Sequence, residues 1–163
     1  MMILLDKNRI ERTLKRMAYQ ILEETKGHPI TLVGLNIRGY AVALRLKKHL
    51  VAIQESDVPL FQVKAESDTS VQFSKNLNEN NVLVLVDDVI FSGGTMFNTI
   101  RKIPDLSVFN KILLTVLVDR GHRKYPLLAG VVGVHAPTKL NEHVELTLEN
   151  NEPKDLVLIQ NNK

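Results

Sequence analysis

Val82-Leu83-Val84-Leu85-Val86-Asp87-Asp88-Val89-Ile90-Phe91-Ser92-Gly93-Gly94-Thr95 is the stretch from which both the fold and a site can be predicted. Its first five residues are apolar, which is typical of a central strand that is buried on both faces of a parallel sheet. Two carboxylates, a Ser-Gly-Gly-Thr loop and a plausible helix follow. We therefore expect the strand to end at the acids, on the sheet edge where open α/β sheets bind their ligands.

The Ser-Gly-Gly-Thr loop has the chemistry of an anion site. Its two glycines can take positive φ angles and let a ligand approach the backbone closely. Successive N–H groups there, with the start of the next helix, form a concave anion site, to which Ser92 and Thr95 add hydroxyl donors. Asp87 and Asp88 would lie behind this loop as acceptors for sugar hydroxyls. Each piece alone also fits a solvated turn or a helix-capping loop, but their order predicts a sugar-phosphate site.

Several other kinds of site lack support in the sequence. The chain has neither Gly-x-x-x-x-Gly-Lys-Ser/Thr nor Gly-x-Gly-x-x-Gly, which disfavours a nucleotide triphosphatase and a dinucleotide dehydrogenase. Ser92 does not lie in a Gly-x-Ser-x-Gly elbow, the pattern expected of a serine nucleophile. The five histidines show no metal-ligand spacing, and the absence of cysteine excludes disulfides and thiolate sites.

Length and composition indicate one domain, residues 1–163, of an ordinary soluble protein. The chain is 44% hydrophobic and 24% charged, and no apolar stretch approaches the length of a membrane span. The lack of cysteine and of a signal-peptide pattern fits a cytoplasmic protein without membrane contact. The net charge of +3 would help to attract phosphorylated ligands but is far from the dense basic patch of a nucleic-acid-binding protein.

Hydrophobic periodicity predicts an α/β fold with a mostly parallel central sheet and helices on both faces. We expect a helix capped by Asp6 that runs to about Lys26, and further helices over residues 40–50 and 96–103. Strands are expected over residues 30–35, 58–63, 82–86, 112–118, 130–134, 144–148 and 156–159, the last two paired with each other. Residues 66–80 are polar and without period, as in a functional or mobile loop.

Two further segments place charged groups at the same sheet edge. Arg38-Gly39 follows the first predicted strand, and an arginine there can grip a phosphate or pyrophosphate with two hydrogen bonds, although alone it could be a surface residue. Asp119-Arg120-Gly121-His122-Arg123 follows another buried strand. His122 could act as a general base, but a lone histidine in a polar loop is more often structural.

These motifs resemble those of a known family. Residues 84–95 resemble the phosphoribosyl-pyrophosphate (PRPP) signature of type I phosphoribosyltransferases. A finer resemblance, to the bifunctional pyrimidine-operon attenuation regulator / uracil phosphoribosyltransferase family, rests on residues 10–26 and 33–39, on Leu117-Val118-Asp119-Arg120-Gly121-His122-Arg123, and on Pro126 and Pro137-Thr138. The resemblance covers nearly the whole chain and is weakest between residues 51 and 81.

The resemblance implies a magnesium-dependent enzyme that transfers ribose 5-phosphate from PRPP to uracil and releases pyrophosphate. It also implies a homodimer or larger oligomer, a mobile lid over residues 64–78 and a small C-terminal hood. The implied roles are catalysis and Mg²⁺ contact for Asp87 and Asp88, PRPP binding for Phe91, Ser92, Gly93, Gly94 and Thr95, pyrophosphate binding for Asn36, Ile37, Arg38 and Gly39, base binding for Val118, Asp119 and Arg120, and a cationic lid residue in Lys64.

Departures from the family pattern leave two alternatives open. The family usually has arginine at the position of Gly94, and Gln62-Val63-Lys64-Ala65 replaces its Tyr-Arg-Asp-Asp lid stretch. Positions at which its attenuators carry RNA-contacting side chains are here Tyr19, Leu128 and Val134, whereas Arg120, Arg123 and Lys124 remain basic. The chain could therefore be a nucleotide-sensing, RNA-binding regulator with little catalysis, or a phosphoribosyltransferase that acts on another base.

Overall fold

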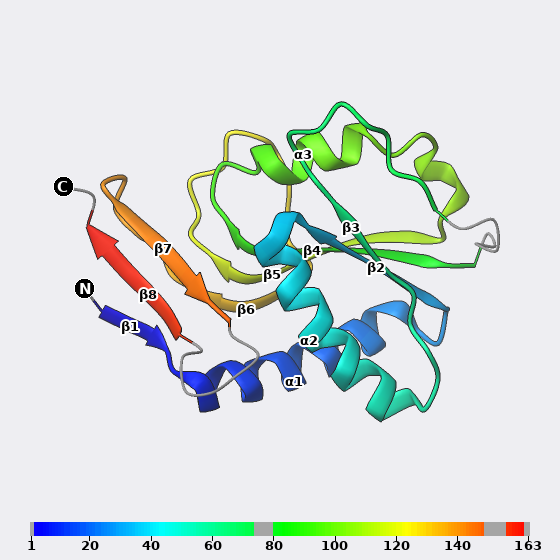
Figure 1. Cartoon of the computed structure of the whole chain (residues 1–163), viewed down its shortest axis with the longest axis horizontal. Coiled ribbons are helices and arrows are strands. Elements are labelled where there is room, and N and C mark those ends of the chain that lie inside the picture. Colours follow the sequence, from blue (N-terminus) through cyan, green and yellow to red (C-terminus); the bar gives the residue numbers. More distant parts are fainter. Residues whose placement is uncertain (1, 74–79, 149–155, 162–163) are drawn as a thin grey trace.

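A parallel sheet of five strands forms the centre of the computed structural model, which describes residues 2–73, 80–148 and 156–161 (Figure 1). The strand order is β3-β2-β4-β5-β6, and every neighbouring pair is parallel. The strands are β2 (Ile30–Leu35), β3 (Leu60–Val63), β4 (Val82–Ile90), β5 (Lys111–Asp119) and β6 (Val131–His135). The expected parallel sheet is confirmed.

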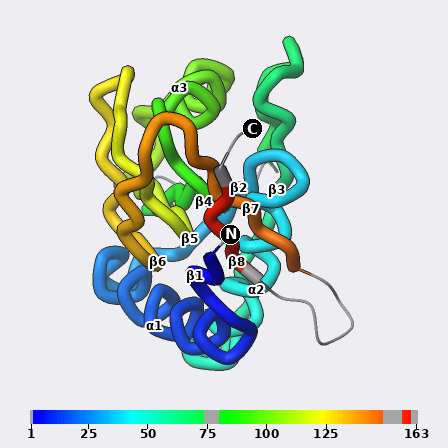
Figure 2. The backbone as a smooth tube through the Cα atoms, turned by 90° about the vertical axis from the view of Figure 1, so that its left-hand side faces the viewer, coloured from blue at the N-terminus to red at the C-terminus, as the bar shows by residue number. Residues whose placement is uncertain are grey.

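Helices cover both faces of this sheet, as predicted. The helices are α1 (Lys7–Thr25), α2 (Asn36–Gln54) and α3 (Gly94–Arg101), with a short 3₁₀ helix over Leu106–Val108. Figure 2 shows α1 and α2 on one side of the strands and α3 on the other. Among the described helices, none is both long enough and apolar enough to cross a membrane.

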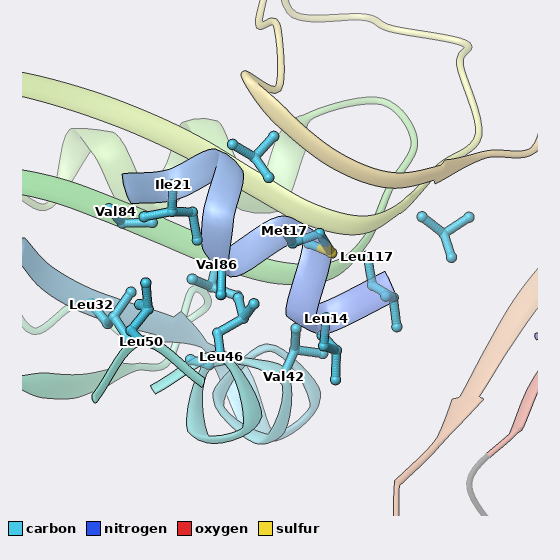
Figure 3. Packing of buried hydrophobic residues seen from close by; sticks show 14 of the residues in the cluster. Leu14, Met17, Ile21, Leu32, Val42, Leu46, Leu50, Val84, Val86 and Leu117 are labelled. Atoms are coloured by element: carbon cyan, nitrogen blue, oxygen red, sulfur yellow. The ribbon is translucent and has the colours of Figure 1, made fainter. Parts of the chain in front are cut away.

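The side chains of β4 alternate between two hydrophobic cores, because successive residues of a strand point to opposite faces. Val84 and Val86 pack with residues of α1 and α2, such as Met17 and Leu46 (Figure 3). Leu83 and Leu85 belong to the core on the side of α3. Both faces are fully buried, which explains the continuous apolar run in the sequence.

Helix α1 has the signals that the sequence predicts. The Asp6 side chain accepts a hydrogen bond from the Arg9 N–H at 2.9 Å and so caps the first turn. Ile10, Leu14 and Met17 form part of its buried stripe. Lys26, in the left-handed region with φ of 50°, ends the helix.

A second sheet joins the two ends of the chain. Its strands are β1 (Met2–Leu5), β8 (Leu156–Asn161) and β7 (Glu142–Thr147), antiparallel in the order β1-β8-β7. The predicted pairing of the last two strands is confirmed, whereas β1 was not expected from the sequence. Val144 and Val157 join the core under α1, and the sheet stands beyond the carboxyl ends of the central strands (Figure 1).

The predicted boundaries of three elements are wrong near the carboxyl edge of the central sheet. β4 does not stop at the acids but continues through Asp87 and Asp88 to Ile90, because β5 accompanies it that far. The helix expected over residues 40–50 begins at Asn36, so that residues 36–39 form the first turn of α2. Helix α3 begins at Gly94, two residues earlier than predicted, and ends at Arg101.

Candidate functional site

The central sheet has a point where its connections diverge. From β2 the chain runs through α2 to β3 on one side, and from β4 it runs through α3 to β5 on the other. The β2–β4 pairing ends at Gly34 and Val86, after which the remaining residues of β4 pair with β5 alone. Such a switch point leaves a crevice at the carboxyl edge, the usual position of a ligand in an open α/β sheet.

A cleft of about 600 Å³ occupies this position. Segments that are far apart in the sequence line it: the start of α2, the end of β4, the start of α3 and the residues at and after the end of β3. Its lining residues are Leu35, Asn36, Ile37, Arg38, Gln62, Lys64, Glu66, Asp87, Asp88, Val89 and Thr95. The cleft therefore brings together seven of the residues predicted from the sequence: Asn36, Ile37, Arg38, Lys64, Asp87, Asp88 and Thr95.

The two carboxylates differ in their surroundings. Asp87 is 7% exposed, and its Oδ1 accepts a hydrogen bond from the Asp88 N–H at 2.8 Å. Burial raises the pKa of Asp87 well above its ordinary value, and repulsion by the neighbouring Asp88 raises it further. Asp88 is half-buried. A cation or several hydroxyl donors in the cleft would offset the cost of ionising this pair.

The start of α2 is built for close approach to the carboxylates. Asn36 has a φ of 57°, a left-handed conformation that asparagine tolerates, so the helix follows β2 without an intervening loop. A Cβ on Gly39 would lie 2.7 Å from the Val86 carbonyl oxygen and 3.1 Å from Asp87 Oδ1. Glycine at position 39 therefore lets the first turn of α2 lie directly on the end of β4.

Polar groups at the start of α2 face the cleft or hold its wall. The Asn36 Oδ1 accepts a hydrogen bond from the Ala65 N–H at 2.9 Å, and its carbonyl accepts one from the Gln62 side chain at 3.1 Å. Ile37 and Arg38 are exposed. No side chain caps the helix and no acidic residue lies in its first turn, so its N–H groups and Arg38 make this end of the cleft positive.

The predicted phosphate loop, residues 91–95, lies partly outside the cleft. Thr95 lines the cleft, while the carbonyl of Ser92 accepts hydrogen bonds from the N–H groups of Lys124 and Tyr125 at 2.9 and 3.1 Å. Gly93 has a φ of 87° and caps α3, as glycine can, whereas Gly94 already belongs to the helix. Of the two glycines that could take positive φ, only the first does so.

The segment after β5 supports the predicted phosphate loop through hydrogen bonds and ring contacts. Arg123 donates hydrogen bonds to the carbonyls of Phe91 at 2.9 Å and Leu127 at 3.1 Å, and to Asp119 Oδ2 at 2.7 Å. The ring of Tyr125 stacks on that of Phe97 in α3, with 4.5 Å between centroids. The loop conformation is therefore fixed by contacts within the protein.

The residues predicted to contact a base have side chains that are engaged internally. Val118 is fully buried, and Asp119 accepts hydrogen bonds from the Gly121 N–H and from Arg123. Burial raises the pKa of Asp119, but these two hydrogen bonds and the nearby charge of Arg123 outweigh it and hold the pKa below its ordinary value. Arg120, 8% exposed, donates from Nε to Thr138 Oγ1 at 2.7 Å and from Nη2 to the Glu142 carbonyl.

Four lining residues, Leu35, Gln62, Glu66 and Val89, were given no role from the sequence, and the two polar ones are Gln62 and Glu66. Both belong to a segment without strong periodicity, and no motif marks them, so only the fold brings them to the cleft. The adjacent Lys64, predicted to belong to a lid, is exposed beside them. Lys102, at the end of α3, donates from its Nζ to the carbonyls of Lys64, at 2.9 Å, and Ala65, which anchors this segment. The rest of the predicted lid includes residues 74–79, which lie outside the described residues.

The histidine and basic residues of the last motif also have structural partners. His122 Nε2 lies 2.6 Å from the Thr138 carbonyl oxygen, and its ring lies 5.3 Å from that of Phe91. Of the basic residues considered for RNA contact, Arg120 is buried and Arg123 is tied to backbone carbonyls, whereas Lys124 is exposed. The internal contacts of Arg120 and Arg123 leave Lys124 as the exposed cation of the three.

Comparisons with known proteins agree with this geometry. The family model described as "Phosphoribosyl transferase domain" matches residues 2–148. The Bifunctional protein PyrR of Alkaliphilus metalliredigens is 35% identical over 98% of this chain and 95% of its own length. The protein of the same name from Streptococcus mutans is 35% identical over 92% of this chain and 90% of its own length.

Solved structures show the same fold at lower identity. The hypoxanthine phosphoribosyltransferase of Trypanosoma cruzi superposes with a TM-score of 0.74 at 17% identity, covering 100% of this chain and 98% of that one. A hypoxanthine-guanine phosphoribosyltransferase from Bacillus anthracis gives 0.64 at 21% identity, covering 84% and 85%. The chain therefore belongs to the phosphoribosyl transferase domain family, within the group of bifunctional PyrR relatives.

Proposed function

We propose that the protein transfers the ribose 5-phosphate group of PRPP to uracil, giving UMP and pyrophosphate. The observation that carries the proposal is the meeting, in one cleft, of two adjacent carboxylates with the starts of two helices, α2 and α3. Helix starts favour anions, and carboxylates favour hydroxyls and cations. PRPP carries a pyrophosphate, a 5′-phosphate and two ribose hydroxyls, and so presents the complementary groups.

The two helix starts would hold the two ends of PRPP. Arg38 and the free N–H groups of α2 would bind the pyrophosphate, together with Asn36, Ile37 and Gly39 as part of the same turn. The N–H groups and hydroxyls from Phe91 to Thr95, including Ser92, Gly93 and Gly94, would bind the 5′-phosphate at the start of α3. Two anionic groups would thus be fixed on either side of the carboxylates.

Asp87 and Asp88 would accept hydrogen bonds from the ribose 2′- and 3′-hydroxyls. Loss of pyrophosphate leaves positive charge at the anomeric carbon, and fixed carboxylates beside the ribose would stabilise that charge. The base nitrogen would attack this carbon directly, so the reaction needs no covalent enzyme intermediate. Water is a competing nucleophile, and closure of the segment that contains Lys64 would exclude it.

The donor set fits Mg²⁺. No group of three or more histidine, cysteine, aspartate or glutamate side chains able to hold a metal occurs within residues 2–73, 80–148 and 156–161. Mg²⁺ is usually held by one or two carboxylates together with substrate phosphates and water, a role that Asp87 and Asp88 can fill. When bound with PRPP, it would neutralise charge on the leaving pyrophosphate.

The base would lie beside the end of β5, near Val118, Asp119 and Arg120. Because their side chains have internal partners, recognition there would depend on backbone groups and on the shape of the pocket. Uracil is proposed from the similarity to the PyrR relatives, as is a homodimer or larger assembly. Gel filtration with light scattering tests the assembly: a monomer at working concentration would contradict it.

The decisive experiment measures pyrophosphate release from PRPP with Mg²⁺ and each of a panel of free bases. We expect release with uracil, and loss of at least a thousandfold in turnover when Asp87→Asn and Asp88→Asn are combined. Asp57→Asn is the matched control, because Asp57 is exposed in the segment between α2 and β3. Release with a purine alone would change the substrate, and undiminished turnover in the double variant would refute the site.

The RNA-binding alternative needs its own measurement. A titration of a pyrimidine-leader RNA at low and moderate salt would detect it, because neutralised phosphates make affinity fall steeply with salt. Absence of binding at low salt would remove that alternative without affecting the enzymatic proposal.

A further inference from the structure

One aromatic ring links the phosphate loop to the second sheet. Phe91, the residue before Ser92, has the Arg120 guanidinium 4.3 Å from its ring centroid and the His122 ring 5.3 Å from it. Both of these residues belong to the segment that follows β5. The ring therefore packs against two side chains that also contact a segment nearer the C-terminus.

Those two side chains bind the same short segment, residues 138–142. Arg120 donates to Thr138 Oγ1 at 2.7 Å and to the carbonyl of Glu142, the first residue of β7. His122 Nε2 lies 2.6 Å from the Thr138 carbonyl oxygen. Thr138 is itself buried. The chain that leads into the second sheet is thus tied to the phosphate loop through Arg120, His122 and the Phe91 ring.

Burial of the Arg120 side chain is expected to cost stability. Its guanidinium is nearly buried, and its hydrogen bonds go to a hydroxyl and a carbonyl, so the described contacts include no carboxylate within salt-bridge distance. Burying a charge costs stability unless geometry repays it. A planar guanidinium can lie over a ring and donate in its own plane to two acceptors, which lysine cannot do. The arrangement favours a role in exact placement over a role in stability alone.

We propose that Arg120 is a positioning residue that sets the distance between the phosphate loop and the segment 138–142, and thereby the wall beside which the base docks. This inference rests on the proposed function, since it assumes that the 5′-phosphate binds after Phe91 and the base beside the end of β5. The side chain of Arg120 then does not touch the base. Its loss changes how the base meets the anomeric carbon, while PRPP keeps its contacts with α2 and the carboxylates.

The test compares Arg120→Met with Arg16→Met. Arg16 is the matched control because it too donates to two backbone carbonyls, those of Val132 and Gly133, where α1 meets β6. Each purified full-length variant is assayed with PRPP and base varied separately, and its melting temperature is measured. We expect Arg120→Met to change kcat/KM for the base at least tenfold and KM for PRPP less than twofold. Arg16→Met should leave both within twofold.

Other results overturn the proposal in recognisable ways. Equal effects on PRPP and base, or a lower melting temperature with unchanged kinetics, would make Arg120 a structural residue only. If Arg120→Met does not fold, Thr138→Val decides, because it removes the hydroxyl that accepts from Arg120 Nε and should produce the same base-selective loss. Wild-type protein that releases no pyrophosphate with any base overturns the proposed function itself. Turnover in the wild type with unaltered variants overturns the positioning role alone.

Discussion

Replacing Asp87 by asparagine should stabilise the metal-free protein while abolishing its activity. Asp87 is 7% exposed, next to a second carboxylate, and its pKa lies well above the ordinary value because of burial and of Asp88. A raised native pKa means that ionisation disfavours the folded state. The neutral carboxyl makes its full contribution to stability below the pKa of the group in the unfolded state, at about pH 4. This contribution is lost as the pH rises through the pKa of the group in the native state.

The size of the effect follows from the contacts of this carboxyl group. Burying a polar group without a compensating partner costs about 1–3 kcal/mol, and more when the group is charged. Asparagine keeps the Oδ1 that accepts from the Asp88 N–H. Its NH2 group, however, needs hydrogen-bond acceptors of its own, and burying it without them costs about 1 kcal/mol. We expect a net gain of about 1–2 kcal/mol at neutral pH, equivalent to about 2–8 °C in a chain of this size.

The assay is urea unfolding of wild type, Asp87→Asn and the control Asp57→Asn, in chelator, from acid to neutral pH. The difference between Asp87→Asn and wild type should favour the variant most at neutral pH. Below about pH 4, where both states of the wild-type carboxyl are protonated, this gain should be lost and only the cost of the amide group, about 1 kcal/mol, should remain. Carboxylates with lowered pKa, such as Asp119, act alike in both proteins and cancel. A variant that is less stable at neutral pH, or a gain that does not change with pH, would refute the reasoning.

Three further changes test other contacts. Thr115→Val should raise stability by about 1 kcal/mol with unchanged kinetics, because the Thr115 hydroxyl is buried without a described hydrogen-bond partner; an unchanged urea midpoint would contradict this. Arg38→Ala should raise KM for PRPP about tenfold or more but not KM for the base, whereas Lys48→Ala, exposed on the same helix, should alter neither. Gly39→Ala should destabilise the protein by about 1–3 kcal/mol and reduce turnover, since its Cβ would lie 2.7 Å from the Val86 carbonyl oxygen; a wild-type melting temperature would show that α2 can shift.

The sequence predicts those parts of the fold that local pattern controls. The apolar run of β4, the cap at Asp6 and the loop at Gly93 follow from the side chains themselves. The end of β4 does not, because a strand lasts as long as its partner does, and Ile90 pairs with Asp119 of β5. The strand β1 is short and half of it is exposed, so no alternation marks it.

The same distinction applies to the candidate site. Asp87, Asp88 and Arg38 were predicted as neighbours because the carboxyl ends of parallel strands share one edge. Arg120 was expected at the same edge, and beside a base by resemblance to the family, but its partners at Thr138 and Glu142 come from another part of the chain. A residue type and its position on a strand therefore locate a side chain at an edge without fixing the direction in which it points.

The position of the cleft follows from one difference in strand length. β2 ends at Leu35 and turns into α2 through the left-handed Asn36, while β4 continues beyond the last β2 pair with β5 alone beside it. The missing neighbour leaves Asp87 and Asp88 open on the side of β2, and Gly39 lets the uncapped start of α2 close in on them. A strand end with two carboxylates and an uncapped helix start are thereby placed in contact, which neither segment could achieve alone. Any change that lengthens β2, or that pushes α2 away at position 39, should separate the two halves of the site even if every lining residue is retained.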